Sequence, residues 1–366
     1  MQALPLATPF YLGWRTIKPA RSMESHPSRV TRMPSLSFPA DGYPTAPRSS
    51  AGLPPSKASG SGEAGKVSVV LPTRNRAMFV ERAIRSVLHQ TVQDFEILIV
   101  NDGSTDTTAE VLDVLAIEDP RIRVRHLSQS VGVSAARNAA IEHSSGSYIA
   151  FLDDDDEWLP SKLEVQLAAL REAPPDVAGV YSPYWRVDAS GRTDVWGAVN
   201  VSGSLSRREF FRRNLIATPS VVLRRDILAK VGGFDETLPC LEDWDLWVRI
   251  SAVAKFIFVP EPLVKVHFTP GSLTMQSDAH IKACHILVAK VSARDDINKT
   301  ELADWHYALG HVLMISGVPW EGKKLLRRSI RLWPWPPQRL GMALLAECQT
   351  DLYQFLSALH RRLIQP

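Results

Sequence analysis

Residues 148–158 read Tyr-Ile-Ala-Phe-Leu-Asp-Asp-Asp-Asp-Glu-Trp, and this stretch decides the fold of the chain. Residues 148–152 are apolar or aromatic throughout and have turn-forming residues on either side, a pattern that predicts a short buried β-strand. Four carboxylates, Asp153 to Asp156, follow directly where that strand ends. Adjacent like charges at a strand end repel one another and lose hydration on burial, so another group must compensate them.

The acidic run has two interpretations. Mg²⁺ or Mn²⁺ compensates such carboxylates well, because it binds one or two protein oxygens together with the phosphate oxygens of a nucleotide. Alternatively, the run is a solvated turn in which Asp156 or a neighbour caps a helix that begins near Pro160. The rest of the chain favours the first interpretation.

The composition is that of a globular protein, since 45% of the 366 residues are hydrophobic and 22% are charged. Residues 66–280 carry 23 Lys and Arg against 29 Asp and Glu, whereas both flanking regions are basic. An acidic middle argues against a nucleic-acid groove and suits a site that recruits a metal for an anionic ligand. The three cysteines include no Cys-x-x-Cys pair, which argues against a disulfide framework or zinc site and indicates a reducing, cytoplasmic compartment.

Three regions are predicted along the chain. Residues 1–65 hold ten of the 26 prolines and no apolar period, which predicts a disordered extension rich in Pro, Ser and Gly. Residues 66–276 form the predicted α/β domain, and residues 277–366 read as a helical region. No run of about 18 apolar residues occurs, so no transmembrane helix is expected.

Strands and helices alternate from residue 66 onward. Short apolar runs predict strands at residues 67–71 (closed by Pro72), 95–100, 122–127 and 148–152. Apolar stripes and turn signals predict intervening helices at residues 80–88, 107–117 and 133–143. This alternation predicts right-handed crossovers and a doubly wound, mostly parallel sheet with flanking helices.

Ligands bind such sheets outside the carboxyl ends of the strands. Three polar loops are expected at that edge, at residues 73–76, 101–106 and 153–157. No Gly-x-Gly-x-x-Gly follows the first strand, and no Walker-type Gly-Lys-Ser/Thr is present, which argues against a Rossmann dehydrogenase and a P-loop NTPase. A nucleotide at this edge would be held by carboxylates, a metal and loop backbone.

Six blocks of sequence resemble glycosyltransferase family 2, in the family's order. They are residues 69–75, 99–106, 132–138, 151–156, 231–236 and 241–247, within a resemblance that extends from residue 66 to about 275. The resemblance implies the GT-A fold and metal-dependent, inverting transfer from a nucleoside-diphosphate sugar, most simply a UDP-sugar. The acceptor would be a hydroxyl of a glycan or lipid-linked sugar, as in polysaccharide biosynthesis.

The resemblance also implies roles on the donor side. Thr73 and Asp102 match positions that contact the nucleotide base, and Arg76 lies where a side chain can approach the nucleotide. Asp153 and Asp155 match the family's Asp-x-Asp motif. Asp155 would be the direct metal ligand, and Asp153 would face the ribose or the metal.

Arg137 and His267 each keep two interpretations. Arg137 would lie near the ribose or diphosphate, or would instead pair with the acidic run from a helix face. His267 would belong to a loop that closes over the diphosphate or the metal, or would be a hydrogen-bonded structural residue at a strand end.

The pair Glu242-Asp243 matches the family's acidic pair on the acceptor side, with Asp243 as general base. A carboxylate is required there, because an attacking hydroxyl must lose its proton. The same pair also reads as a helix N-terminus, since Trp244 and Trp247 begin a buried stripe, and both interpretations can hold. Tyr184, Trp185 and Trp196 would form an acceptor platform or belong to the core.

The C-terminal region reads as helices. Residues 301–333 loosely resemble one helix–turn–helix unit of the tetratricopeptide kind. Within them, Lys and Arg alternate with apolar residues from 323 to 333, as in a basic amphipathic helix. Such a helix either makes peripheral contact with the anionic inner face of a membrane or shows a solvated face while packed on the domain.

Two alternatives to sugar transfer remain. The first is a nucleotide-sugar-binding protein without turnover, against which the presence of Asp155 and Asp243 argues. The second is a sugar nucleotidyltransferase, which usually has a Gly-rich, basic loop after the first strand. Residues 72–78 contain no glycine, which argues against that second alternative.

Overall fold

The computed structural model describes residues 65–197, 205–268, 277–348 and Tyr353. The predicted extension at residues 1–65 lies outside this part, apart from Gly65. A mostly parallel sheet is the centre of the fold, with strand order β10-β6-β9-β4-β1-β2-β3. Its strands are β1 Val67–Thr73, β2 Phe95–Asn101, β3 Ile122–His126, β4 Tyr148–Phe151, β6 Val177–Tyr181, β9 Val221–Arg224 and β10 Lys255–Phe258. Only β9 runs antiparallel to its neighbours within this sheet, which confirms the predicted fold class.

A second, smaller sheet was not predicted from the sequence. It has the order β5-β11-β7-β8. Its strands are β5 Glu157–Trp158, β7 Tyr184–Val187, β8 Thr193–Trp196 and β11 Val264–His267. Strand β5 follows the acidic run directly, so this sheet connects that run to the end of β11.

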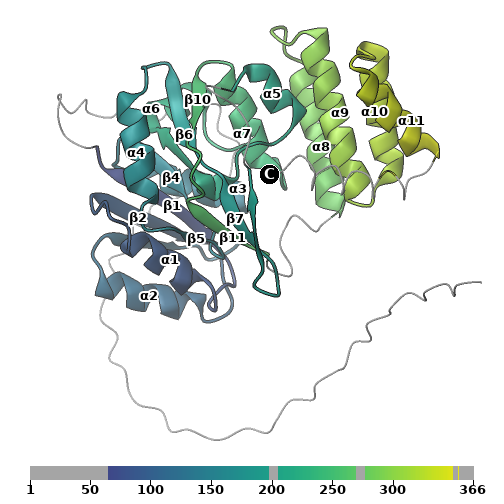
Figure 1. Ribbon diagram of the computed structural model, residues 1–366. Coiled ribbons are helices and arrows are strands. Elements are labelled where there is room, and N and C mark those ends of the chain that lie inside the picture. The colour runs from purple at the N-terminus through teal and green to yellow at the C-terminus, as the bar shows by residue number, and fades with distance from the viewer. Residues whose placement is uncertain (1–64, 198–204, 269–276, 349–352, 354–366) are drawn as a thin grey trace, which may run out of the picture. The chain divides into compact units, whose positions relative to one another are not determined.

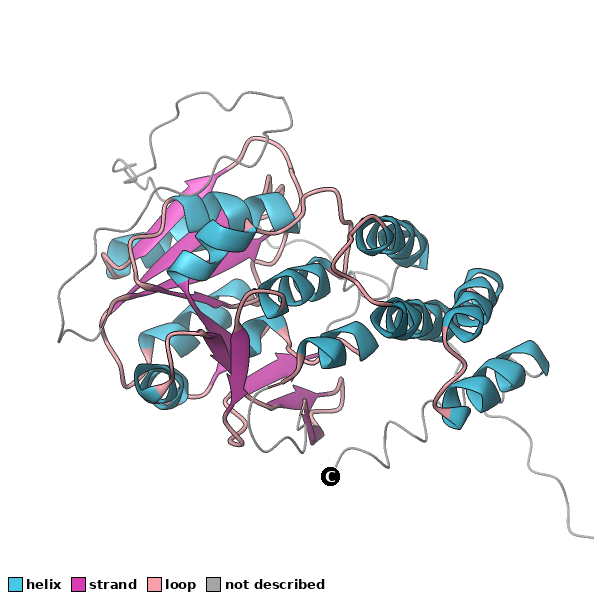
Figure 2. Cartoon of the chain, turned by 90° about the horizontal axis from the view of Figure 1, so that it is seen from above, coloured by secondary structure: helices cyan, strands magenta, loops and turns pink. Residues whose placement is uncertain are grey.

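Helices cover both faces of the central sheet (Figures 1 and 2). They are α1 Val80–Leu88, α2 Thr108–Glu118, α3 Val133–Glu142, α4 Lys162–Glu172, α5 Arg207–Arg212, α6 Arg225–Val231 and α7 Glu242–Ser251. On β1, Val69 and Leu71 face a core shared with α1, α2 and α4, whereas Val70 faces a core shared with α3, α5 and α7. The period-two alternation of a strand thus supplies two cores from one element.

The structure changes two local expectations. Strand β1 continues through Pro72 to Thr73 instead of ending at residue 71. Proline is tolerated there because the pairing of β1 with β4 ends at Val70 and Phe151, so no N–H is needed from Pro72 on that side. The helix expected near Pro160 begins at Lys162, after Ser161. Asp156 does not cap it, because its carboxylate accepts the backbone N–H of His267 instead (3.0 Å).

The described C-terminal region is helical, with α8 Ser277–Ser292, α9 Lys299–Ile315, α10 Pro319–Leu332 and α11 Pro337–Cys348. Trp305 of α9 packs edge-on against Trp244 of α7, with ring centroids 4.9 Å apart, so these helices share a core with the central sheet. Within the described residues, no helix combines the length and apolarity needed to cross a bilayer.

Helices α9 and α10 form the expected helix–turn–helix, with Gly317 at φ 79° in the turn. They approach closely, because a Cβ on Gly322 would lie 2.8 Å from the carbonyl oxygen of Gly310. Leu325 and Leu326 of α10 are buried, whereas Trp320 is 65% exposed. The apolar side of the basic helix is therefore turned inward, and its outer side carries the charged residues.

Candidate active site

Three loops lie side by side at the carboxyl edge of the central sheet. Thr73 ends β1 and pairs with Asn101 at the end of β2. The backbone N–H of Asp102 then donates to the carbonyl of Thr73 (2.8 Å). The acidic run follows β4, which pairs with the other edge of β1. The predicted loops 73–76, 101–106 and 153–157 are thus neighbours.

The Asp102 carboxylate organises the loop that precedes α3. It accepts the hydroxyl of Ser130 (2.7 Å) and the backbone N–H groups of Val131 (2.6 Å) and Gly132 (3.0 Å). A carboxylate offers about four acceptor positions, and three are used within the protein. Contact with a nucleotide base would use the remaining position.

The acidic run carries more negative charge than its protein neighbours compensate. Burial, followed by repulsion from Asp155 and Asp153, raises the pKa of Asp154 to about 7, against the lowering effects of the nearby Thr73 hydroxyl and Arg76. That hydroxyl is buried and finds no hydrogen-bond partner of normal geometry among the described residues. The guanidinium of Arg76 is only a distant partner, 3.8 Å from Asp154 and 3.9 Å from Asp155.

A divalent cation fits this group of oxygen donors. Mg²⁺ and Mn²⁺ prefer carboxylate and phosphate oxygens, and a cation would relieve the repulsion that raises the pKa of Asp154. Within the described residues, no three acidic, histidine or cysteine side chains converge well enough to hold a metal alone. A cation held by Asp155 and Asp153 would therefore complete its coordination with oxygens of a nucleotide and water.

His267 lies against the acidic run. Its backbone N–H donates to Asp156, and its ring Nε2 lies 2.7 Å from Glu157 Oε1. The same Glu157 oxygen also forms an ion pair with Arg82 (3.3 Å). Burial and Arg82 lower the pKa of the His267 imidazole, against the effect of Glu157. Both interpretations of His267 remain open, because its ring is hydrogen-bonded yet belongs to the acidic loop.

Arg137 joins the acidic run to the pair Glu242-Asp243. It lies in α3 and its side chain is only 5% exposed. One guanidinium nitrogen bonds to Asp153 Oδ1 (2.7 Å) and another to Glu242 Oε1 (2.6 Å). The two carboxylates raise its pKa despite burial. The pairing with the acidic run is thus present, while contact with ribose or diphosphate stays a prediction.

Asp243 lies at the first turn of α7, next to Glu242. Its carboxylate accepts the Asn214 amide (2.9 Å) through one oxygen and the backbone N–H of Trp244 (2.6 Å) through the other. Burial and repulsion from Glu242 raise the pKa of Asp243 to about 6, against these hydrogen bonds and Arg137. A carboxyl group that titrates near neutral pH has the basicity that a general base requires.

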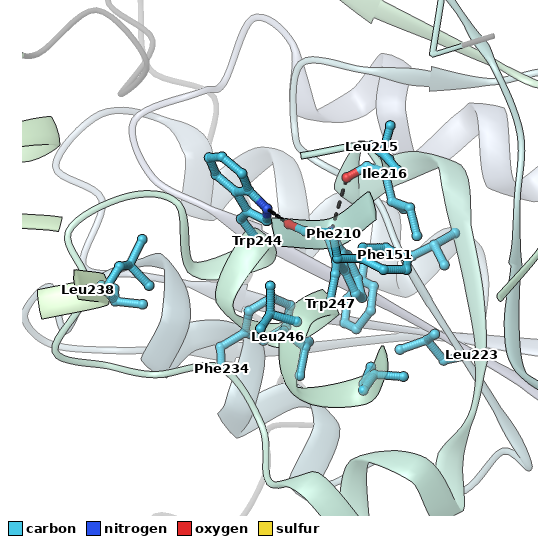
Figure 3. Close-up of a cluster of buried hydrophobic side chains, with 14 of the residues drawn as sticks. Phe151, Phe210, Leu215, Ile216, Leu223, Phe234, Leu238, Trp244, Leu246 and Trp247 are labelled. Atoms are coloured by element: carbon cyan, nitrogen blue, oxygen red, sulfur yellow. Dashed lines mark hydrogen bonds between the residues drawn. The ribbon is translucent and has the colours of Figure 1, made fainter. Parts of the chain in front are cut away.

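Aromatic side chains hold α7 in place. The indole N–H of Trp244 donates to the carbonyl of Phe210 (2.6 Å), and that of Trp247 donates to the carbonyl of Ile216 (3.0 Å), as Figure 3 shows. Both tryptophans are buried in the core. The two bonds fix residues 210–216 against α7, with Asn214 between them facing Asp243.

Three residues near Asp243 come from residues 176–220, which carry no recognisable motif. Asn214 contacts Asp243 directly, and the Thr218 hydroxyl is a weaker partner at 3.4 Å. The pKa of the Tyr184 hydroxyl on β7 is raised to about 12. Burial is the largest cause, and the negative charges of Asp156 and Asp243 add to it. The sequence suggested Tyr184 through its aromatic ring alone and gave no signal for Asn214.

Residues 68–232 match the family model described as glycosyl transferase family 2. Over these residues the chain is similar to the family 2 glycosyltransferases. Among its relatives, an uncharacterized glycosyltransferase of Rickettsia bellii is 31% identical over 228 residues, 60% of this chain and 32% of that protein. WcaA of Escherichia coli, named for colanic acid biosynthesis, is 33% identical over 189 residues, 50% of this chain and 65% of that protein. The chain spans about a third of the length of the Rickettsia relatives.

Solved structures share the fold over most of this chain. TarS of S. aureus, residues 1–349, has a TM-score of 0.58 at 17% identity, covering 81% of this chain and 91% of that one. The mannosyltransferase PcManGT of Pyrobaculum calidifontis, in complex with GDP-Man and Mn²⁺, has a TM-score of 0.52 at 18% identity, covering 80% of this chain and 84% of that one. These likenesses confirm the GT-A type fold.

Proposed function

We propose that the chain is an inverting glycosyltransferase that moves a sugar from a nucleoside diphosphate to a hydroxyl of a glycan or lipid-linked acceptor. One observation carries the proposal: Arg137 bonds to Asp153 of the acidic run and to Glu242 of the acceptor-side pair. Donor-side and acceptor-side carboxylates thus belong to one site. A pure binding protein requires no second acidic pair beside the nucleotide, and a nucleotidyltransferase is disfavoured by the absence of glycine from residues 72–78.

Asp243 is the proposed base. It takes the proton of the acceptor hydroxyl as that oxygen attacks the anomeric carbon from the side opposite the leaving diphosphate, so the anomeric centre inverts. Asn214 holds one carboxylate oxygen of Asp243. A divalent metal, when bound, neutralises charge on the departing nucleoside diphosphate. Asp155 and Asp153 are the residues proposed to hold it, with His267 near them.

A UDP-sugar is the expected donor, with a GDP-sugar as the second candidate. TarS has been solved with UDP-GlcNAc, and PcManGT with GDP-Man and Mn²⁺. Thr73, Asp102 and Arg76 line the same edge of the sheet and would contact the nucleotide. The donor preference is open to direct measurement because a ligand that binds only the folded state raises its stability.

A thermal-shift screen of nucleotide sugars tests the proposal. A ligand at a hundredfold excess over its Kd adds about 2.7 kcal/mol to the free energy of unfolding. We expect a UDP-sugar to raise the Tm with Mn²⁺ and to raise it much less with a chelator. Asp155→Asn should abolish the Mn²⁺-dependent part, whereas Glu172→Gln, at the far end of α4, should keep it. A shift that is the same with and without metal would contradict the metal assignment.

Peripheral membrane contact is a separate proposal that rests on the outer side of α10. Lys324 and Arg327 there pair with Glu321 (2.8 Å) and Glu347 (2.6 Å). Lys323, Arg328 and Arg331 form no ion pair within the described residues. Each such cation near an anionic membrane surface contributes about 1 kcal/mol to the binding free energy, so binding of the chain to the membrane should be weak and salt-sensitive.

We expect the full chain to co-sediment with phosphatidylserine-rich vesicles at low salt and to be released at high salt. Exchanging Lys323, Arg328 and Arg331 for glutamine should abolish the co-sedimentation, because the unpaired charges are lost. Vesicles of phosphatidylcholine are the matched control. Equal binding to both kinds of vesicle would refute an electrostatic contact.

A further inference from the structure

A row of three polar side chains on and just after α1 lies against the backbone that follows the acidic run. Arg82 and Ser86 are four residues apart, so both lie on the same side of the helix, and Gln90 follows just after its end. Three hydrogen bonds join this polar row to that backbone, namely Arg82 Nη2 to the Asp155 carbonyl (2.5 Å), the Trp158 N–H to the Ser86 hydroxyl (3.0 Å), and the Gln90 amide to the Leu159 carbonyl (2.8 Å). The polar row thus fixes residues 155–159 along α1.

Arg82 is the member of the polar row that contacts the proposed metal ligand. Asp154 and Asp155 lie in a turn, in which the N–H of Asp156 donates to the carbonyl of Asp153 (3.1 Å). Burial and repulsion from Asp155 and Asp153 raise the pKa of Asp154, so this turn carries charges that push one another apart. Arg82 places a cation beside the turn and holds Asp155 through its backbone carbonyl rather than through its carboxylate.

The same guanidinium also contacts Glu157. Its Nε lies 3.3 Å from Glu157 Oε1, and that oxygen lies 2.7 Å from the ring Nε2 of His267. Arg82 therefore fixes both the turn that carries Asp155 and the carboxylate that holds His267. A planar guanidinium presents several N–H donors in a fixed fork, which suits it to two such contacts, whereas a lysine has a single ammonium group.

Phe79 helps to orient this arginine. The guanidinium carbons of Arg76 and Arg82 lie 5.8 and 6.0 Å from the centre of the Phe79 ring, at the range of a cation–π contact. The side chain of Arg82 is 39% exposed, and an ion pair of such exposure contributes little to the stability of a fold. Loss of Arg82 should therefore change the geometry of the acidic run more than the free energy of unfolding.

We propose that Arg82 is a positioning residue for the divalent cation, since it holds Asp155 directly and His267 through Glu157. The inference rests on the proposed glycosyltransferase function and adds a residue to the same site. Replacing a residue that orients metal ligands typically lowers metal affinity by about 10- to 100-fold. Because the cation would take part of its coordination from the nucleotide, this loss should appear as weaker metal-dependent binding of the nucleotide.

The test measures UDP binding to the full chain by calorimetry, once with saturating Mn²⁺ and once with EDTA. The ratio of the two Kd values, EDTA over Mn²⁺, gives the contribution of the metal. We expect Arg82→Met to lower this ratio about tenfold and to leave the Kd in EDTA unchanged. Arg82→Lys, which keeps the charge but not the fork, should lose part of the ratio. A role in general stability alone would not separate the two Kd values in this way.

Arg85→Met is the matched control. Arg85 lies three residues further along α1, is 44% exposed, and pairs with Glu81 (2.7 Å) and Glu118 (3.3 Å), so it resembles Arg82 in exposure and in partners. This variant should keep the parent ratio, and urea midpoints measured on all samples report on folding.

The inference is overturned if a folded Arg82→Met keeps the parent ratio, or if Arg85→Met loses as much. If Arg82→Met does not fold, an unchanged ratio in Arg82→Lys overturns it. A parent chain that binds UDP equally with Mn²⁺ and with EDTA would contradict the metal assignment of the proposed function itself, and this inference would fall with it. A parent ratio well above one, with no change in the Arg82 variants, would contradict the role of Arg82 alone.

Discussion

Replacing Asp243 with asparagine should stop sugar transfer while Mn²⁺-dependent nucleotide binding stays intact. Asparagine keeps the shape of the side chain, and its amide oxygen can still accept a hydrogen bond from the Trp244 backbone N–H or from Asn214. It cannot take a proton at neutral pH. Loss of a general base lowers kcat by about 10²- to 10⁴-fold. Initial rates and the thermal shift with nucleotide sugar, measured on one preparation, separate chemistry from binding.

The pH profile gives an independent check on the same residue. The pKa of Asp243 is about 6, and the base acts in its ionised form, so kcat/KM should rise as pH increases through 6. Asn214 donates a hydrogen bond to the carboxylate and lowers that pKa. Removing the donor in Asn214→Ala should therefore shift the acidic limb of the profile to higher pH.

Two outcomes would contradict the base assignment. Transfer at the parent rate by Asp243→Asn would show that another group accepts the proton, with Glu242 as the adjacent candidate. An acidic limb that stays at the parent position in Asn214→Ala would show that the titration belongs to a group other than Asp243.

Asn138→Ala is not a suitable control, because Asn138 holds the backbone of Phe234. Gln129→Ala, on the loop before α3, is a better one.

The central sheet was predictable because its signals are local. A short apolar run before the acidic residues predicts β4, and the stripe from Val80 to Val87 predicts α1, since each pattern depends on neighbours within a few positions. The loops 73–76, 101–106 and 153–157 could then be placed at one edge, because parallel strands put their carboxyl ends together. Boundaries differed by a residue or two where pairing with a neighbour, as at Pro72, extended a strand.

The links between loops could not be predicted, because they join residues far apart in the sequence. Arg137 bonds to Glu242 across 105 positions, and His267 bonds to Asp156 across 111. Composition and periodicity carry no information about such contacts. The interpretation of Asp156 as a helix cap was wrong for the same reason. Its carboxylate accepts a hydrogen bond from the backbone N–H of His267, which lies on the distant strand β11.

Arg137→Met should be the most destabilising single change at the site. Methionine fills a similar volume but leaves Asp153 and Glu242 without the cation that each contacts at 2.6–2.7 Å. Removing one partner of a buried ion pair costs about 3–5 kcal/mol, because the remaining charges stay buried without compensation. We expect the urea midpoint to fall by a corresponding amount and transfer to be lost.

A double-mutant cycle separates the ion pair from general damage to α3. Glu242→Gln removes one of the two carboxylates but leaves the bond between Arg137 and Asp153, so it should cost less than Arg137→Met. In the Glu242→Gln background, Arg137→Met leaves only one uncompensated carboxylate. Its effect on the free energy of unfolding should therefore be smaller than in the parent by about 1 kcal/mol or more. Strict additivity would mean that Arg137 and Glu242 do not stabilise each other, so that Arg137 acts through its bond to Asp153 and its ring contact with Phe234 (5.1 Å). A clear coupling would instead establish that the bond between Arg137 and Glu242 stabilises the fold, so that α3 and α7 are held together at the candidate site by this ion pair.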